Sequence, residues 1–277
     1  MQRARWRLVV LVTLSAAAAA GAQAGSHAGG VLLEDLSWVE AEKVLTPEAV
    51  VVIPLGAAAK EHGPHLPLSA DWLIAEYFKR ELLKRSDVVM APTITYYYYP
   101  PFAEYPGSTT LSLETARGLL VDVCRSLARY GPRRFYVINV GLATLPALQA
   151  AVDQLAKESI TVRYLEFAKA ILPAKEIIEQ EGGSHADEVE TSLLLYMVPD
   201  RVDMSKAVKD FRPRKGYPTR DPNNTEGTYL PSGVYGDATL ATSAKGRRFT
   251  ETLLEDMLRS IAELRSSGAP APAPAAP

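Results

Sequence analysis

The fold is decided by the stretch AVVVIPLGAAAKEHGPHLPLSAD, residues 49–71. Its first part, 49–56, is continuously apolar and rich in β-branched side chains, which predicts a buried strand. The amphipathic run from Trp72 to Arg85 predicts the helix that follows. The polar residues between them therefore lie beyond the carboxyl end of a strand, where open α/β sheets place their binding sites.

Strands and helices alternate along the rest of the chain. Apolar runs predict strands over 87–95, 134–139 and 160–166, and amphipathic runs predict helices over 112–129, 146–157 and 244–264. This alternation is typical of right-handed βαβ crossovers. We therefore predict an α/β fold with a mainly parallel sheet covered on both faces.

Both ends of the chain differ in composition from the part between them. In residues 1–24 a basic start, an apolar run and a small-residue cleavage site predict a signal peptide. That run is too short for stable membrane insertion, for which about 20 apolar residues are needed. Residues 266–277 are rich in alanine and proline, which predicts a disordered tail. Residues 25–265 then form one domain, which we expect to be periplasmic or secreted.

Charge and cysteine content narrow the function classes. The formal net charge is −2 and no basic cluster is present, so we expect no nucleic-acid partner. The single cysteine, Cys124, falls in a helical pattern and is interpreted as a small core residue. A domain with one cysteine has no internal disulfide, so its hydrophobic core has to stabilise it alone.

Three residue types that bind divalent metals crowd into the first loop, as Glu61, His62 and Asp71, with His65 nearby. Clustered glutamate, histidine and aspartate suit a borderline ion such as Zn²⁺ or Mn²⁺. The alternative is structural. Asp71 would cap the helix that follows, and the histidines would only form hydrogen bonds within the loop.

A second polar segment contains His185 and Glu190. Ser184 and Asp187 resemble a capping box, which predicts a helix that begins near His185. Glu190 falls on the buried stripe of that helix, and a buried carboxylate needs a cation or strong donors. A metal would supply the cation, and an arginine or lysine partner is the alternative. For His185 the alternative is a water-exposed position at the helix start.

Two further features stay open from the residues alone. The aromatic loop Tyr96–Phe102 is either the edge of the core or a substrate wall. Asn139 either binds a ligand or holds the turn after its strand. The chain has no dinucleotide-binding Gly-x-Gly-x-x-Gly after a strand, no phosphate loop and no Gly-x-Ser-x-Gly elbow.

These residues resemble the creatininase (creatinine amidohydrolase) family over nearly all of the chain after the leader. The matching segments are Pro54-Leu55-Gly56, His62-Gly63-Pro64-His65-Leu66-Pro67-Leu68 with Asp71, Pro106-Gly107-Ser108-Thr109, His185-Ala186 with Glu190-Thr191-Ser192, and Gly233-Val234-Tyr235-Gly236-Asp237. The resemblance implies a three-layer α/β/α fold, often assembled as a hexamer. It also implies hydrolysis of C–N bonds in small amides, cyclic and formyl amides among them, at a one- or two-metal centre.

The resemblance also implies roles for single residues. His62 and Asp71 match metal ligands, Asp71 as the bridge, while His185 matches the region of a proton-transfer residue and Glu190 a further ligand. The chain departs from the family pattern at two points. Glu61 adjoins His62, whereas the family has one residue between acid and histidine. The family's Asn-Gly-His segment is here Asn139-Val140-Gly141, so the histidine of the second metal is missing.

Together these inferences predict an exported, metal-dependent amidohydrolase. Glu61, His62, Asp71 and Glu190 would hold a Zn²⁺ or Mn²⁺ ion, and His185 would give a proton to the leaving nitrogen. We expect a small-molecule amide substrate and a homo-oligomer. The alternative function is that of a catalytically inactive binding protein with the same fold and at most one structural metal.

Overall fold

A computed structural model describes residues 29–267 of the chain. The predicted signal peptide lies outside the described residues, as does nearly all of the predicted tail. Within the described part, none of the helices combines the length and the apolar character needed to cross a membrane.

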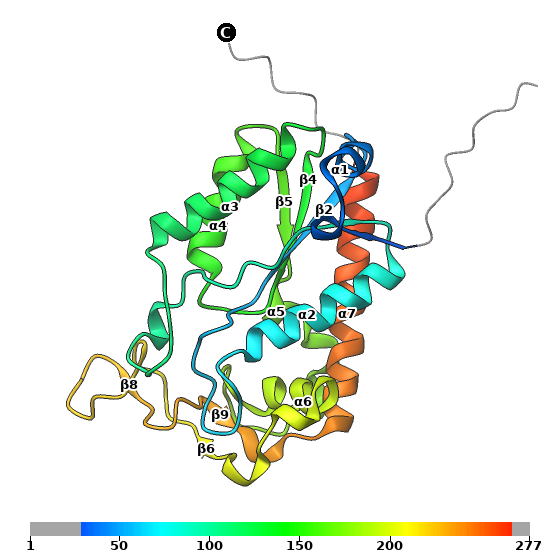
Figure 1. The fold of residues 1–277 in the computed structure, drawn as a ribbon. Coiled ribbons are helices and arrows are strands. Elements are labelled where there is room, and N and C mark those ends of the chain that lie inside the picture. Colours follow the sequence, from blue (N-terminus) through cyan, green and yellow to red (C-terminus); the bar gives the residue numbers. More distant parts are fainter. Residues whose placement is uncertain (1–28, 268–277) are drawn as a thin grey trace, which may run out of the picture.

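Short strands and longer helices alternate through this part of the chain (Figure 1). The α-helices are α1 (Trp38–Val44), α2 (Ala70–Arg85), α3 (Leu113–Ala128), α4 (Leu145–Ala156), α5 (Phe167–Ala170), α6 (Glu188–Met197) and α7 (Ser243–Ser266). The strands are β1 (Val31–Leu32), β2 (Val50–Leu55), β3 (Val89–Met90), β4 (Arg134–Asn139), β5 (Thr161–Tyr164), β6 (Lys209–Asp210), β7 (Pro218–Thr219), β8 (Thr228–Tyr229) and β9 (Gly236–Asp237).

The central sheet is parallel and has the strand order β1-β3-β2-β4-β5. β2 and β4 form its middle and pair in register from Val50 with Arg134 to Leu55 with Asn139. Every residue of both strands is buried, which fits the apolar sequence of β2 and the apolar run 135–138 within β4. The loops after β2 and β4 therefore leave the sheet side by side, at its carboxyl edge.

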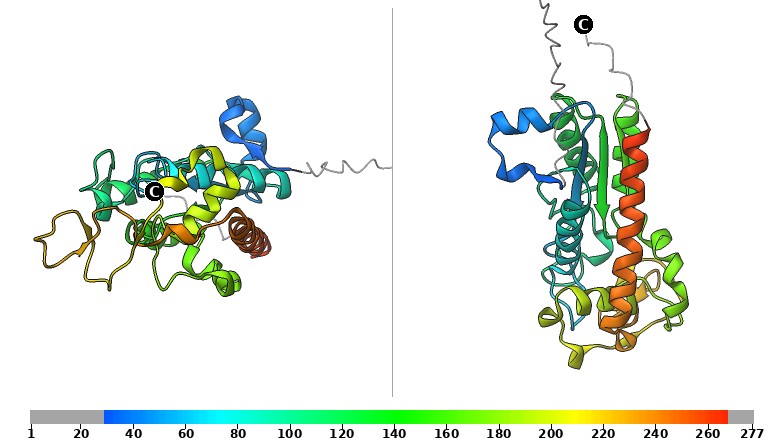
Figure 2. Two further views of the ribbon diagram at one scale, coloured as in Figure 1. Left: turned by 90° about the horizontal axis from the view of Figure 1, so that it is seen from below. Right: turned by 90° about the vertical axis from the view of Figure 1, so that its right-hand side faces the viewer.

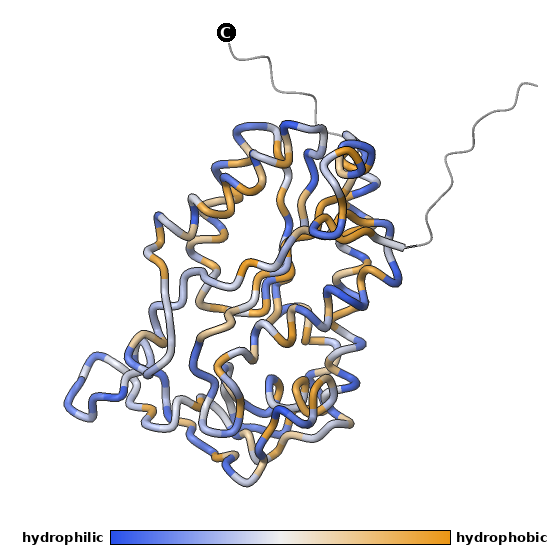
Figure 3. Tube along the Cα trace, in the orientation of Figure 1, coloured by the Kyte–Doolittle hydropathy of each residue, from blue (hydrophilic) through white to orange (hydrophobic). Residues whose placement is uncertain are grey.

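Helices cover both faces of this sheet and give three layers (Figure 2). Successive residues of β2 enter opposite cores: Val50 and Val52 contact the core shared with α2 and α7, whereas Val51 and Ile53 contact the core shared with α3 and α4. Hydrophobic residues accordingly follow the strands and the inner sides of the helices (Figure 3). The predicted α/β/α architecture is confirmed.

Most predicted elements are confirmed, with differences at two places. The strand predicted over 87–95 is shorter, as β3 covers only Val89–Met90 and Ile94 adds a single bridge to Leu55. The helix expected to begin near His185 begins at Glu188. Asp187 is its N-cap, and the positive φ of Ala186 interrupts any earlier helical turn.

Candidate active site

The loop after β2 is anchored by backbone contacts at both ends. Lys60 N donates to Leu68 O at 3.0 Å, and Trp72 N donates to Ala57 O at 3.1 Å. Gly63 has a φ of 71°, a left-handed conformation that favours glycine at the tight turn after His62. These contacts fix the backbone of the loop. Its polar side chains are therefore held at the carboxyl ends of the strands.

A first group of contacts surrounds Asp71, which is 1% exposed. His62 Nε2 lies 2.7 Å from Asp71 Oδ1, and Lys60 Nζ lies 2.7 Å from Asp71 Oδ2. The other ring nitrogen of His62, Nδ1, lies 2.9 Å from the carbonyl oxygen of Lys60. Burial alone would raise the pKa of Asp71, but the Lys60 ammonium and then His62 hold that pKa below its usual value.

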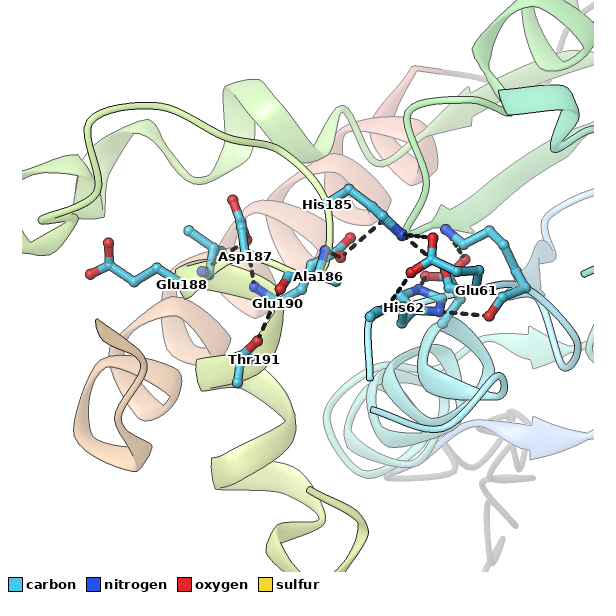
Figure 4. A network of polar contacts seen from close by, with 12 residues as sticks. Glu61, His62, His185, Ala186, Asp187, Glu188, Glu190 and Thr191 are labelled. Atoms are coloured by element: carbon cyan, nitrogen blue, oxygen red, sulfur yellow. Dashed lines mark hydrogen bonds and ion pairs between the residues drawn. The ribbon is translucent and has the colours of Figure 1, made fainter. Parts of the chain in front are cut away.

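A second group surrounds His185, whose ring lies between two carboxylates (Figure 4). Nε2 lies 3.0 Å from Glu61 Oε2, and Nδ1 lies 3.5 Å from Glu190 Oε2. The desolvation of the buried ring would lower the pKa of His185, but Glu61 first and then Glu190 raise it above its ordinary value. The two carboxylates therefore stabilise positive charge at this position.

Backbone donors fix both of these carboxylates. Glu190 Oε2 accepts a hydrogen bond of 2.6 Å from Ala186 N, and Glu61 accepts one from Gly63 N. A Cβ at Gly233 would overlap the Glu61 carboxylate, so the loop before β9 needs glycine at this close approach. Among residues 29–267, neither carboxylate pairs with an arginine or lysine, which leaves the charge of both available to His185 or to a cation.

The structure brings all five predicted site residues into one buried cluster: Glu61, His62, Asp71, His185 and Glu190. Asp71 does not act as the helix cap of the alternative interpretation, because its carboxylate contacts His62 and Lys60. His185 is 6% exposed, so the water-exposed alternative is wrong. Glu190 has His185 as its neighbour, in place of the arginine or lysine of the alternative.

Within this cluster, ligand atoms of His62, His185 and Glu190 lie within 4.8 Å of one another and could hold a metal ion. Two imidazoles and one carboxylate are the ligand set of several catalytic zinc sites. The carboxylate of Glu61 against His185 is also the usual outer partner of a metal-bound histidine. The residues fit a divalent ion, provided that one nitrogen of His62 leaves its present partner.

A cavity of about 330 Å³ adjoins the cluster. Lys60, His185 and Glu190 supply its polar wall beside the cluster, and Arg214 adds a further charge. The remaining lining is mainly apolar and aromatic, with Pro100, Pro101, Phe102, Leu142, Pro146 and Tyr217 among its members. Its volume and its mixture of apolar walls with a few polar groups suit a small molecule.

The structure also decides the roles of the aromatic loop Tyr96–Phe102 and of Asn139. Tyr97 and Tyr99 are buried in the core, and Phe102 is the aromatic residue of this loop that lines the cavity. Asn139 holds the turn, since its Nδ2 donates to Gly141 O at 3.0 Å and its Oδ1 accepts from Thr144 at 2.6 Å.

The sequence interpretation missed Lys60 as a member of the site. A lysine beside a surface loop is usually solvated. Its position two residues before His62, next to Glu61 and after a buried strand, is the one signal that could have drawn attention to it. Arg214 and Tyr217 were missed as well, because nothing in their local sequence indicates that their segment reaches the cavity.

Comparison with known proteins settles the family. The model of the creatininase family, described as creatinine amidohydrolase, matches residues 34–261. The chain belongs to this family. It is 31% identical over 225 residues to the mycofactocin precursor peptide peptidase of Mycobacterium tuberculosis, covering 76% of this chain and 84% of that protein. It is 26% identical over 258 residues to the creatinine amidohydrolase of Pseudomonas putida, covering 84% of this chain and 96% of that protein.

Solved structures of creatininases share this fold. A crystal structure of creatinine amidohydrolase (creatininase) has a TM-score of 0.68 and 22% sequence identity, covering 86% of this chain and 99% of that one. A manganese form of creatininase has a TM-score of 0.68 and 23% identity over shares of 86% and 99%. The layered architecture of this creatininase-family chain is therefore that of the solved members.

Proposed function

We propose that the chain is a metal-dependent amidohydrolase that cleaves a C–N bond of a small amide bound in the cavity beside His185. One observation carries the proposal. In a chain of the creatininase family, a buried group with the composition of a metal site (His62, His185 and Glu190) has two members on the wall of a cavity for a small molecule. The names of the two relatives above, an amidohydrolase and a peptidase, both denote hydrolysis of an amide bond.

His62 and Glu190 would hold the ion, Zn²⁺ or Mn²⁺, and His185 would be either a third ligand or the proton donor. A bound divalent ion lowers the pKa of a water molecule towards neutrality and polarises a carbonyl group. In the overall reaction the water oxygen bonds to the carbonyl carbon, the C–N bond breaks, and the nitrogen leaves with a proton. Glu61 orients His185 from behind through the contact of 3.0 Å, and Ala186 N fixes the carboxylate of Glu190.

His185 has two possible roles, and one measurement separates them. If His185 is a ligand, the His185→Ala variant loses the ion. If His185 is the proton donor that the sequence predicts, the His185→Ala variant loses turnover and keeps the ion. The raised pKa of His185 and its place between two carboxylates support the proton donor. Its place in the close group supports the ligand.

The test combines turnover with metal analysis on the purified chain. We expect hydrolysis within a panel of cyclic amides, N-formyl amides and short peptides, activated by Zn²⁺ or Mn²⁺. The variants His185→Ala and Glu190→Gln should lower kcat/KM by at least about 10²-fold. His65→Gln is the matched control. This buried histidine contacts Thr191 and does not line the cavity, so the turnover of the variant should be near that of wild type. Equal activity of all four proteins would contradict the proposal.

A non-catalytic binding protein is the second candidate. It is supported by the cavity wall after β4, where Gly141 and Leu142 stand in the segment that carries a histidine in the family. Tight binding of Zn²⁺ or Mn²⁺ with no turnover across the amide panel would favour this candidate.

Export and assembly are further proposals that rest on the leader sequence and the family resemblance. Mass spectrometry of the protein from the periplasmic or secreted fraction should find a chain that lacks about the first 24 residues. Light scattering of the purified protein should find a homo-oligomer. A cytoplasmic full-length chain, or a monomer, would contradict the respective proposal.

A further inference from the structure

The ammonium group of Lys60 is enclosed inside the site. The residue is 2% exposed, although lysine side chains usually keep their charge in water. Its Nζ lies 2.7 Å from Asp71 Oδ2, 4.7 Å from the centre of the Phe102 ring and 5.6 Å from the centre of the Tyr99 ring. The carboxylate and the two rings all favour a cation at this point.

Both oxygens of Asp71 are already engaged. Oδ2 faces Lys60 Nζ and Oδ1 faces His62 Nε2, each at 2.7 Å. A divalent ion on this carboxylate would have to lie close to the lysine ammonium, and the two cations would repel each other in a buried setting. The internal cation and an ion on Asp71 therefore exclude each other.

We propose that Lys60 is a built-in cation that takes the place of one divalent ion at Asp71, so that the site holds at most one ion, in the group formed by His62, His185 and Glu190. The inference rests on the proposed function only for that single ion. It assigns Asp71 to Lys60 and to the orientation of His62, in place of the bridging-ligand role that the family resemblance implies.

Lys60 also lines the cavity beside His185 and Glu190. An ammonium carries three N–H donors, and Asp71 is its one carboxylate partner among the described residues. In this position the ammonium can stabilise negative charge on the oxygen of a bound amide. A second metal ion would have the same effect. A purely structural ion pair is the competing explanation, and it predicts no change in the number of bound ions.

The experiment counts ions in the folded chain. Wild type, Lys60→Met, Lys60→Arg and the double variant Lys60→Met/Asp71→Asn are equilibrated with excess Zn²⁺ or Mn²⁺, dialysed and analysed for metal per chain. Lys79→Met is the matched control. Lys79 is also a buried lysine, 6% exposed with Nζ 2.5 Å from Glu34 Oε1, but it lies outside the cavity.

We expect at most one ion per chain for wild type, Lys60→Arg and Lys79→Met. Lys60→Met should bind one more ion than wild type, because Asp71 loses its internal counter-charge. The double variant should return to the wild-type number, because the additional ion needs the Asp71 carboxylate.

Two ions per wild-type chain would overturn the inference, as would a folded Lys60→Met protein with the wild-type number. If Lys60→Met does not fold, the ion counts of the wild type and the double variant still test the inference. A double variant that binds fewer ions than wild type would show that Asp71 is a ligand. These counts do not depend on turnover, so an inactive protein with one ion would contradict the proposed function and leave this inference standing.

Discussion

At the residue scale, the site is a set of buried charges that compensate one another. Lys60 and Asp71 form one close pair, and His185 lies between Glu61 and Glu190. Isolated charges would be very costly at such low exposure, and each of these groups has an oppositely charged or polar partner. This compensation explains how five charged or ionisable side chains can gather at one edge of the sheet.

His65 behaves differently, because it is buried and no carboxylate in the described part of the chain pairs with it. Its Nε2 lies 2.8 Å from Thr191 Oγ1. Burial first, and then the nearby His62, lower the pKa of His65 to about 4 from an ordinary value of 6.5. Between these values the unfolded chain takes up a proton that the folded chain does not. Folding stability therefore falls as the pH falls through this range.

We predict that wild type loses about 1–2 kcal/mol more stability between pH 7 and pH 5 than His65→Gln, which cannot titrate. Urea unfolding at pH 7, 6 and 5 measures the difference, with the m-value as a check on two-state behaviour. An identical pH dependence of the two proteins would show that the pKa of His65 is the same in the folded and unfolded states.

At the scale of elements, α6 and α7 pack so closely that they need a glycine. A Cβ at Gly246 of α7 would overlap the carbonyl oxygen of Ser192 in α6. This contact positions the site, because α6 carries Glu190 in its first turn. Asp187 fixes the start of the same helix, accepting hydrogen bonds at 3.0 Å from Val189 N and at 3.1 Å from Glu190 N.

We predict that Gly246→Ala destabilises the protein by at least about 2 kcal/mol, since overpacking forces the two helices apart. Gly118→Ala is the matched control, because Gly118 also lies within a helix, α3, and a Cβ there meets nothing within 4 Å. That control should gain about 0.5–1 kcal/mol from helix propensity. Chemical unfolding of both variants measures the contrast, and equal stabilities would refute it.

At the scale of the whole molecule, two hydrophobic cores and internal charge pairs stabilise the fold. Two hydrophobic cores fill the two faces of the sheet, and the carboxylates of the site have partners from the chain itself. Arg134 links distant parts of the scaffold, donating to Arg265 O at 2.9 Å and to Pro47 O at 3.0 Å. We therefore expect the architecture to form the site before any ligand binds.

We predict that a chelator leaves the protein folded. The far-UV circular dichroism should stay unchanged after removal of divalent ions. The Tm should return to its original value when Zn²⁺ or Mn²⁺ is restored, because an ion that binds the folded state raises Tm only by mass action. Unfolding on chelation would mean that an ion holds the scaffold together, and it would contradict the internal charge compensation described above.

The sequence by itself determined the scaffold and the two segments that build the site. The apolar run of β2 and the alternation of strands and helices are local patterns, and they place the loop containing His62 at the carboxyl edge of a parallel sheet. The residue types of this loop and of the segment around His185 also indicate their chemistry.

Only the tertiary structure decided which charges meet. Glu61 and His185 are 124 residues apart, and the segment that carries His185 is held by a backbone bridge to Tyr235. The pairing of Lys60 with Asp71 depends on the turn at Gly63 and on the rings of Phe102 and Tyr99, which no local pattern specifies. Periodicity reports which residues are buried. The partner of a buried charge is a long-range property that is set by packing.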